Sequence, residues 1–258
     1  MKFLKYDLMN VGVLGDIHSS LENLNGILSL LEVDKRKRII TIGDTWDRGK
    51  EPNEVINILY DLYTTGKLIP IVGNHDMKFI RYLHNSKDVV MGSQQQGTLQ
   101  LITDESKAKF LEIYSEEIVS IYDPTIKIFI SHGPGGRPAK ILAKNYESIK
   151  ILVGGMANIS FEEFLLKDSH IVAKKHIATL LYGITNGDKN SDGFPIRLPI
   201  IKSIEDDLDG WTYIYGHIHA SNFHPEVNKS CICLDFCSPE GQIAGCIINS
   251  KEDIKLLV

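Results

Sequence analysis

The sequence predicts an α/β fold, and three observations support that prediction. Short apolar runs typical of buried strands alternate with segments in which apolar residues recur at helical spacing. The runs return at intervals of about 30 residues, which is the length of a βαβ unit. The first three runs each end in a glycine and a polar residue, at Gly15-Asp16, Gly43-Asp44 and Gly73-Asn74.

The composition is that of an ordinary globular protein, with 43% hydrophobic and 24% charged residues. The formal net charge of −5 argues against electrostatic binding of nucleic acid by the protein as a whole, so we expect no stable nucleic-acid binding. The first ten residues do not resemble a secretory signal, and no stretch approaches the roughly 20 apolar residues of a membrane span. The cysteines fall between Cys231 and Cys246, as expected in a reduced compartment. We therefore expect a cytoplasmic protein with no membrane partner.

The first 72 residues predict three strands joined by two helices. Leucine and isoleucine between residues 21 and 31 are spaced for one buried helical face, and Ser19-Ser20 can cap that helix. The predicted order is strand 11–14, helix 21–31, strand 38–42, helix 52–63 and strand 68–72.

The remainder mixes helical segments with further strands. Residues 77–119 look mainly helical. Residues 134–201, which include a Gly/Asn/Asp-rich loop at 186–193, are interpreted as a cap or insertion over the site. Strands are expected at 126–130, 212–215, 231–236, 243–248 and 254–258. No clear linker divides the chain, so one domain over residues 1–258 is expected.

Metal-capable side chains follow the predicted strands, at the edge where open α/β sheets place their ligand sites. A pair of divalent ions needs a bridging anion and a mixed set of oxygen and nitrogen ligands. The alternating pairs Asp16-x-His18 and His217-x-His219 let two ligands converge on one small region. The pattern therefore indicates a metal site.

Five short motifs occur in the order typical of one superfamily: Gly15-Asp16-Ile17-His18, Gly43-Asp44-Thr45-Trp46-Asp47-Arg48-Gly49, Gly73-Asn74-His75-Asp76, Ser131-His132-Gly133 and Gly216-His217-Ile218-His219. They resemble the calcineurin-like metallophosphoesterase superfamily. The second motif is closest to the phosphoprotein phosphatase branch and its bacterial relatives. The resemblance implies a four-layer α/β/β/α sandwich of two mixed sheets with helical insertions.

The resemblance also implies a ligand set for two divalent ions. The first ion would be held by Asp16, His18 and His219, the second by Asn74, His132 and His217, with Asp44 bridging them. Manganese is the expected ion, while iron, zinc and nickel remain open because such ligands do not select by affinity alone.

The chemistry implied is hydrolysis of a phosphomonoester, as by a serine/threonine phosphatase, with a metal-bridging hydroxide as nucleophile. His75 would protonate the leaving group and Asp47 would orient His75. Arg48 would bind phosphate oxygens, and Arg137 is a candidate second phosphate contact.

Two departures from the phosphoprotein phosphatase pattern leave other substrates open. Asp76 stands where those enzymes typically carry Glu, and the paired Gly-His-x-His resembles the wider superfamily. The substrate is therefore a phosphoprotein, a nucleotide or an RNA end. Hydrolysis of dinucleoside polyphosphates or of RNA ends is the alternative activity, and a metal-free scaffold of the same fold is the non-catalytic alternative.

Several other features have alternative readings. The basic run 35–38 and Arg197 can contact substrate or lie in solvent. Cys231, Cys233 and Cys237 can form a zinc site or pack in a strand. Trp46 can line the pocket or pack beneath its loop.

Overall fold

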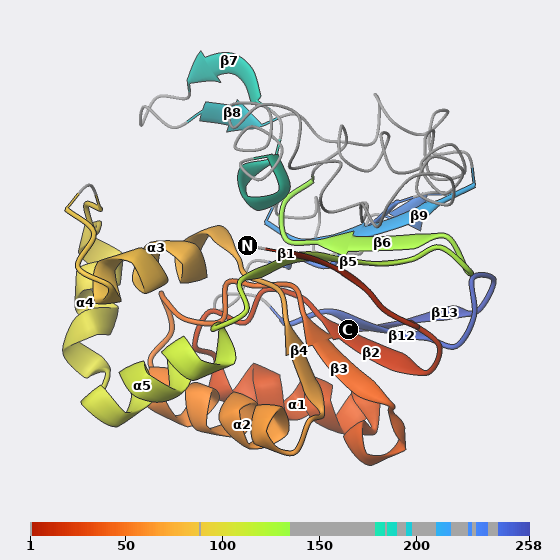
Figure 1. Cartoon of the computed structure of the whole chain (residues 1–258), viewed down its shortest axis with the longest axis horizontal. Coiled ribbons are helices and arrows are strands. Elements are labelled where there is room, and N and C mark those ends of the chain that lie inside the picture. Colours follow the sequence, from red (N-terminus) through yellow and green to blue (C-terminus); the bar gives the residue numbers. More distant parts are fainter. Residues whose placement is uncertain are drawn as a thin grey trace, which may run out of the picture.

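Two β-sheets pack face to face in the computed structural model of the chain, with helices outside one of them (Figure 1). The structure describes residues 2–87, 89–134, 179–183, 185–189, 195–197, 210–217, 227–228, 231–236 and 242–258. Both sheets mix parallel and antiparallel pairs, which confirms the predicted α/β architecture of two mixed sheets with helices.

The first sheet has five strands in the order β13-β12-β2-β3-β4. Its three parallel strands are those predicted in the first third of the sequence, and β12 and β13 are antiparallel to their neighbours. The bounds are Val11–Leu14 for β2, Arg38–Thr41 for β3, Leu68–Pro70 for β4, Gly245–Ile248 for β12 and Ile254–Leu257 for β13.

The second sheet has six strands in the order β1-β5-β6-β9-β11-β10, and β6, β9 and β11 are parallel. The bounds are Lys2–Lys5 for β1, Ile118–Asp123 for β5, Ile128–Ser131 for β6, Thr212–Tyr215 for β9, Val227–Asn228 for β10 and Cys231–Cys233 for β11. A separate two-stranded sheet pairs β7 (Thr185–Lys189) with β8 (Pro195–Arg197).

The helices of the described residues are α1 (Leu21–Leu31), α2 (Pro52–Thr64), α3 (Asn74–Leu83), α4 (Ser93–Leu101) and α5 (Asp104–Ile113), with a 3-10 turn at Val33–Lys35 and one further helical turn at 179–182. α1 and α2 cover the outer face of the five-stranded sheet, while α3, α4 and α5 extend to one side of it (Figure 1). Pro52 begins α2 because the first helical position needs no backbone donor. No described helix is long and apolar enough to cross a membrane.

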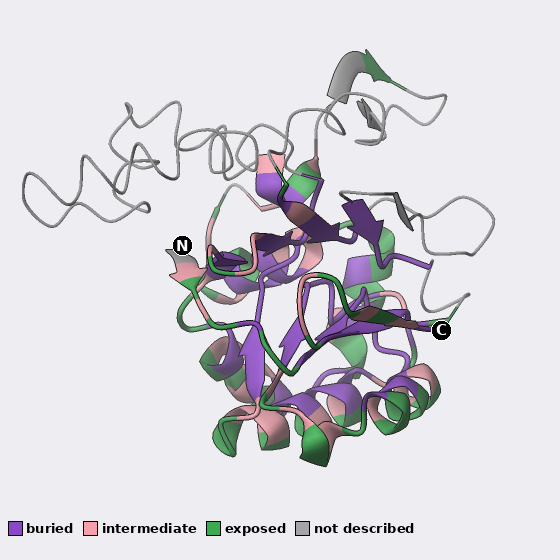
Figure 2. Ribbon diagram, turned by 90° about the vertical axis from the view of Figure 1, so that its right-hand side faces the viewer, coloured by how far each residue is buried: buried purple, intermediate pink, exposed green. Residues whose placement is uncertain are grey.

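The core has two layers, one between the sheets and one between the five-stranded sheet and the helices (Figure 2). Successive side chains of a strand point to opposite faces of the sheet, so one strand contributes to both layers. In β2, Val11 and Val13 face the other sheet, and Leu14 packs in the helical layer with Leu24 and Ile27 of α1. Each fully buried aliphatic side chain of this kind contributes roughly 1.5–3 kcal/mol to the free energy of unfolding.

Most predicted elements agree with the structure to within a few residues. The prediction that residues 77–119 are mainly helical was wrong for the last two residues. They belong to β5, which begins at Ile118 and pairs with both β1 and β6. The prediction of a polar loop at 186–193 was wrong for its first residues, because residues up to Lys189 belong to β7. β1 was not anticipated. Most of the cap expected at 134–201 lies outside the described residues.

Candidate metal centre

Six of the seven predicted ligands lie within the described residues, and all six follow the carboxyl ends of strands. β2, β3 and β4 are parallel in one sheet, and β6 and β9 are parallel in the other, so their carboxyl ends meet at one edge of the sandwich. The first sheet supplies Asp16, His18, Asp44 and Asn74, and the second supplies His132 and His217.

Asp44 lies at the centre of this group. Its Oδ2 atom is 3.8 Å from His18 Nε2 and 3.5 Å from His132 Nε2. The ligand atoms form two sets, each with all its atoms within 4.8 Å of one another: Asp44, His132 and His217 in one, and Asp16, His18 and Asp44 in the other. Asp44 belongs to both sets, as a ligand that bridges two ions must.

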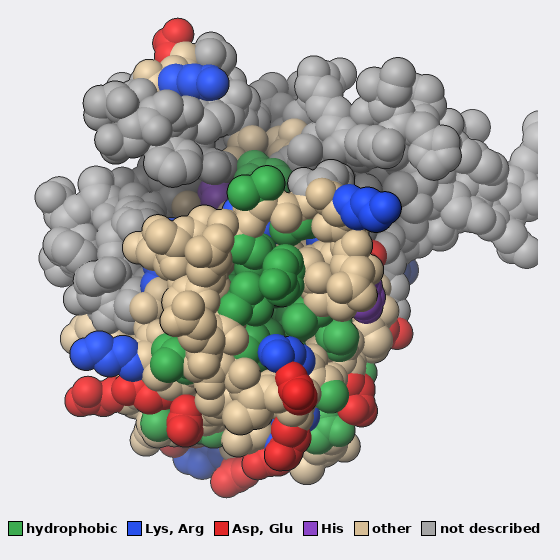
Figure 3. Space-filling view, turned by 90° about the vertical axis from the view of Figure 1, so that its left-hand side faces the viewer, with side chains coloured by type: hydrophobic (Ala, Val, Ile, Leu, Met, Phe, Trp, Pro, Cys, Tyr) green, Lys and Arg blue, Asp and Glu red, His purple; other side chains and the backbone are tan. Residues whose placement is uncertain are grey.

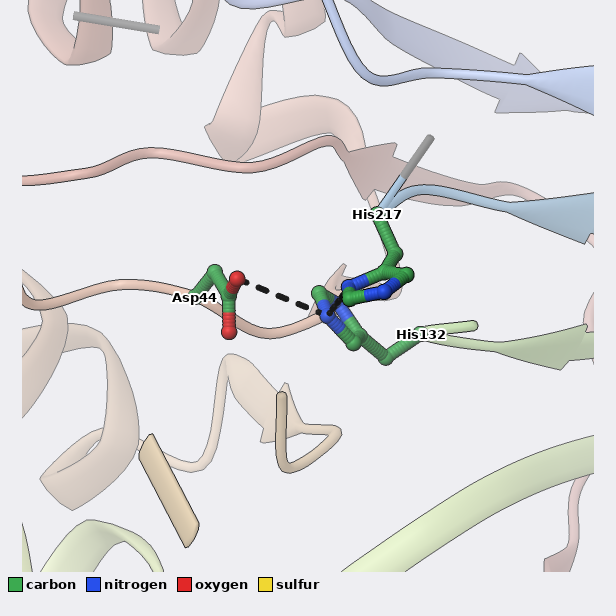
Figure 4. Close-up of side chains that lie close together, drawn as sticks. All are labelled: Asp44, His132 and His217. Carbon is green, nitrogen blue, oxygen red and sulfur yellow. Dashed lines mark hydrogen bonds and ion pairs between the residues drawn. The ribbon is translucent and has the colours of Figure 1, made fainter. Parts of the chain in front are cut away.

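His132 and His217 approach Asp44 from the opposite sheet (Figure 4). His132 Nδ1 lies 2.9 Å from the carbonyl oxygen of Ile42, so this nitrogen must be the donor. In the neutral imidazole, Nε2 then carries a lone pair, yet it lies only 2.9 Å from Asn74 Oδ1 and 3.0 Å from His217 Nδ1. A cation among these atoms would relieve the repulsion between the lone pairs of His132 and Asn74.

Two further polar atoms of the predicted ligand residues are buried without a hydrogen-bond partner. Among the described residues, Asp16 Oδ1 and His18 Nδ1 make no hydrogen bond. Buried polar atoms normally have a partner, so each such exception needs an explanation. Carboxylate oxygens and imidazole nitrogens are ligands of first-row divalent ions. The residues present therefore fit a pair of divalent metals.

The charges of the site are also arranged for cations. Burial raises the pKa of Asp16 well above its ordinary value, and the carboxylates of Asp235 and Asp44 raise it further. Burial opposes the charge of Asp44 too, but the surrounding histidines outweigh burial and lower its pKa. Burial lowers the pKa of His18 to about 3 and also lowers that of His132, so both imidazoles are in the neutral form that binds metals.

The loops of the site adopt backbone conformations that are rare outside glycine. Asp44, Asp47 and His217 have φ angles of 49°, 97° and 68°. Such strain costs ~1–3 kcal/mol per residue and persists where the surrounding structure enforces it. Gly73 allows two of the loops to approach closely, because a Cβ at that position would collide with the backbone nitrogen and carboxylate of Asp44.

His75 and Asp47, the pair expected to act in proton transfer, lie in direct contact. His75 Nδ1 lies 2.5 Å from Asp47 Oδ2, which leaves Nε2 directed to the centre, 3.9 Å from Asp44 Oδ2. Burial opposes protonation of His75, but Asp44 and Asp47 outweigh it and raise the pKa of His75. The pair is thus arranged to hold a proton on His75 beside the centre.

Thr98 holds Asp47 from behind, and its role was not found in the sequence. Its hydroxyl donates a 3.1 Å hydrogen bond to Asp47 Oδ1, which also accepts a 2.9 Å bond from the backbone of Arg48. Thr98 lies on α4, about 50 residues beyond Asp47, and no motif marks it. Only the packing of α4 against the loop reveals the contact.

Asp235 is a second residue that motif analysis missed. It is 2% exposed and lies two residues beyond Cys233, the last residue of β11. Cys233 pairs with Tyr215 in parallel register, so Asp235 lies level with His217 at the same sheet edge. Its position after an apolar run was the available signal, but the run lacks the glycine that marks the other motifs.

Asp76, the departure from the phosphoprotein phosphatase pattern, is fully buried and makes its hydrogen bonds to the loops of the site. Its carboxylate accepts hydrogen bonds of 3.0 Å from the backbone nitrogens of Gly73 and Thr45 and from the Thr45 hydroxyl. Burial and the nearby charge of Asp44 raise the pKa of Asp76 to about 6. The side chain therefore ties two ligand-bearing loops together.

Arg48 lies beside the centre, whereas two other predicted residues fall outside the described part of the chain. Arg48 directly follows Asp47 and donates its backbone N–H to that carboxylate, and its positive charge helps to lower the pKa of His18 and opposes the raised pKa of His75. His219 and Arg137 lie outside the described residues, as does the side chain of Arg197.

The structure resolves several alternatives from the sequence. Trp46 packs beneath its loop: it is fully buried, donates to the carbonyl of Pro52 and stacks on Phe110 with ring centroids 4.1 Å apart. Cys231 and Cys233 form no disulfide bond and are buried in β11, while Cys237 lies outside the described residues.

The basic run 35–38 lies at the other end of β3 from Asp44. Arg38 is the first residue of β3, and Asp44 follows its last. Lys35 pairs with Glu32 and Lys37 with Asp7, with nitrogen–oxygen distances of 2.7 Å in both pairs. The run is therefore remote from the candidate metal centre.

Comparisons with known proteins agree with this site. The sequence model of the calcineurin-like phosphoesterase family matches residues 9–221. An asymmetrical bis(5'-nucleosyl)-tetraphosphatase from Oceanobacillus iheyensis is 24% identical, over 94% of this chain and 86% of that protein. Among solved structures, a candidate diadenosine tetraphosphatase has a TM-score of 0.57 at 13% identity and covers 99% of this chain and 97% of its own. A serine/threonine phosphatase from Saccharomyces cerevisiae has a TM-score of 0.57 at 12% identity, covering 100% and 82%.

The two structural likenesses show the shared fold, and the family match covers every ligand of the candidate centre. The chain matches this family's sequence model, and its described part brings Asp16, His18, Asp44, His132 and His217 together in two groups that could hold metal ions. The chain therefore belongs to the calcineurin-like phosphoesterase family and is a metal-dependent phosphoester hydrolase.

Proposed function

We propose that the protein hydrolyses a dinucleoside polyphosphate, with a dinucleoside tetraphosphate as the best substrate. The observation that carries this proposal is the similarity to an asymmetrical bis(5'-nucleosyl)-tetraphosphatase over 94% of this chain and 86% of that protein. The likeness to a serine/threonine phosphatase rests on fold at 12% identity. Asp76 and the Gly-His-x-His motif also separate this chain from the phosphoprotein phosphatases.

Asp16, His18 and His219 would hold one divalent ion and Asn74, His132 and His217 the other, with Asp44 shared. Bound there, the two ions would supply positive charge for the phosphate oxygens and lower the pKa of a water molecule. Manganese is the ion we propose.

The chain's own side chains would complete the reaction. Hydrolysis forms a bond from a water oxygen to phosphorus and breaks the bond from that phosphorus to the leaving oxygen. His75 Nε2 would give its proton to the leaving oxygen, while the 2.5 Å contact with Asp47 keeps the imidazole in position. Arg48 would bind a non-bridging phosphate oxygen through its planar guanidinium.

A substrate panel tests the proposal. The purified chain, supplied with Mn²⁺, is assayed on diadenosine tetraphosphate, a phosphoserine peptide, RNA with a terminal phosphate and p-nitrophenyl phosphate. We expect the highest kcat/KM for the dinucleotide, with unequal products, a nucleoside triphosphate and a monophosphate. A higher kcat/KM for the phosphopeptide or the RNA end would contradict the proposal.

A further inference from the structure

The outward face of α3 leads away from the catalytic end of the molecule. The helix begins at Asn74, and its buried side is formed by Asp76, Met77, Phe79 and Ile80. His75, Lys78 and Tyr82 follow one another at helical spacings of three and four residues, so they lie along one face. Seven residues separate His75 from Tyr82, a rise of about 10 Å along the helix axis.

This face carries positive charge. Lys78 and Arg81 are the charged side chains on the exposed side of α3, and the acidic residue of the helix, Asp76, is buried against the loops. A phosphate chain that extends from the centre along α3 would therefore meet a cation at Lys78 without a nearby carboxylate of the same helix.

Tyr82 separates two hollows at the far end of this face. Tyr82, Val89, Val90, Met91, Gln96, Leu99 and Gln100 line a hollow of about 520 Å³. Tyr82, Leu83, Asn85, Ser86 and Val89 line a second of about 350 Å³. Tyr82 is 43% exposed and Val90 is 81% exposed. Figure 3 shows hydrophobic side chains gathered in a stripe on this side of the molecule.

The chemistry of the larger hollow suits a nucleobase. An exposed aromatic ring offers a stacking surface that accepts any base. Gln96 donates from Nε2 to the carbonyl oxygen of Met91, which fixes its amide and leaves Oε1 and the second N–H for the polar edge of a base, and Gln100 offers a further amide. Val89 and Met91 provide apolar walls.

We infer that Lys78 and Tyr82 bind the leaving nucleotide of the substrate, Lys78 through its phosphate chain and Tyr82 by stacking on its base. The inference rests on the proposed function, in which His75 protonates the leaving oxygen. Because His75 lies at the start of α3, the leaving group that His75 protonates is the part of the substrate nearest this helix. A ligand that reaches both His75 and Tyr82 must be elongated, anionic near Lys78 and planar at its end, which describes a nucleoside polyphosphate.

The test compares two substrates in each variant of the full chain with Mn²⁺. The readout is the ratio of kcat/KM for diadenosine tetraphosphate to kcat/KM for p-nitrophenyl phosphate, whose leaving group is too short to reach Tyr82. Tyr82→Ala is expected to lower this ratio about tenfold, mainly through KM, because stacking on the base is lost. Tyr82→Phe keeps the ring and should stay within about twofold of wild type.

Lys78→Ala should lower the same ratio, and the loss should shrink as salt is added, because a phosphate contact is screened. The matched control is Lys107→Ala on α5, where Lys107 pairs with Asp104 and lines neither hollow. If Tyr82→Ala leaves the ratio unchanged while wild type hydrolyses the dinucleotide, the inference is wrong and the proposed function stands. If wild type leaves the dinucleotide intact, both are wrong.

Discussion

Asp47 shows how a side chain that binds no metal can still be fixed by several neighbours. Its two oxygens face different partners: Oδ2 contacts His75, and Oδ1 accepts from Thr98 and from the backbone of Arg48. A carboxylate that is held on both oxygens keeps the imidazole in one orientation. The geometry of His75 therefore depends on Thr98, which lies on another helix.

Thr98→Val removes the hydroxyl while conserving the shape of the side chain. We expect kcat to fall about tenfold on alkyl phosphates, whose poor leaving groups need a well-placed acid, and less on p-nitrophenyl phosphate. Rates on both substrates give this comparison. Thr98→Ser should restore the alkyl rate, because serine keeps the donor. An equal loss on both substrates would show that Thr98 only supports the fold.

The cysteines provide a prediction that is independent of catalysis. Cys231, Cys233 and Cys246 form no disulfide bond and are buried, and burial raises the pKa of Cys246 to about 12. A raised thiol pKa keeps the neutral form at pH 8, and only the thiolate reacts. In a Cys237→Ser variant, a disulfide reagent at pH 8 should therefore label no thiol in the native protein and three after denaturation. Rapid labelling of the native variant would contradict this arrangement.

At the scale of elements, the sequence predicted what the local pattern encodes. β2, β3, β6 and β9 were located because each is an apolar run followed by a chemically distinctive motif. Asp235 was missed because its strand lacks such a motif, and Thr98 because its contact is made between distant segments. β1 was missed because its pairing with β5 depends on a partner more than 110 residues away.

Replacing glycine by alanine is predicted to change the free energy of unfolding in opposite directions in the helices and in a loop of the site. Gly26 in α1 and Gly97 in α4 have open space where a Cβ would stand, so changing either to Ala should raise the free energy of unfolding by about 0.5–1 kcal/mol. Gly73→Ala should lower it, because the new Cβ would collide with Asp44. Thermal unfolding of the three variants measures these signs. A stable Gly73→Ala variant that retained metal would refute the close approach of the two loops.

On the scale of the whole molecule, the candidate centre joins the two sheets. Asp16, His18, Asp44 and Asn74 belong to one sheet, and His132 and His217 to the other. An ion that is held by ligands from both sheets can bind only when the two sheets are packed together. Metal binding and the stability of the sandwich are therefore coupled.

Mn²⁺ should raise the melting temperature of the wild-type chain in a saturable way. At a free metal concentration of 100 times Kd, the stabilisation expected for one site is ~2.7 kcal/mol. Asp44→Asn removes the shared charge and should abolish both the shift and bound manganese measured in the purified protein. Asp61→Asn, at an exposed position of α2, is the matched control and should behave as wild type. An equal shift in Asp44→Asn would argue against a shared ligand at that position.

The place of β12 in its sheet bears on how the chain is made. β12 lies between β13 and β2, with Gly245 opposite Leu14, so β2 lacks one neighbour until the last part of the chain is available. During translation, β2 must wait while more than 200 further residues leave the ribosome. Such distant pairing slows folding and leaves an apolar strand edge open in the meantime. The order of strands in this sheet therefore leaves the β12 side of β2 unpaired until the last part of the chain has been made.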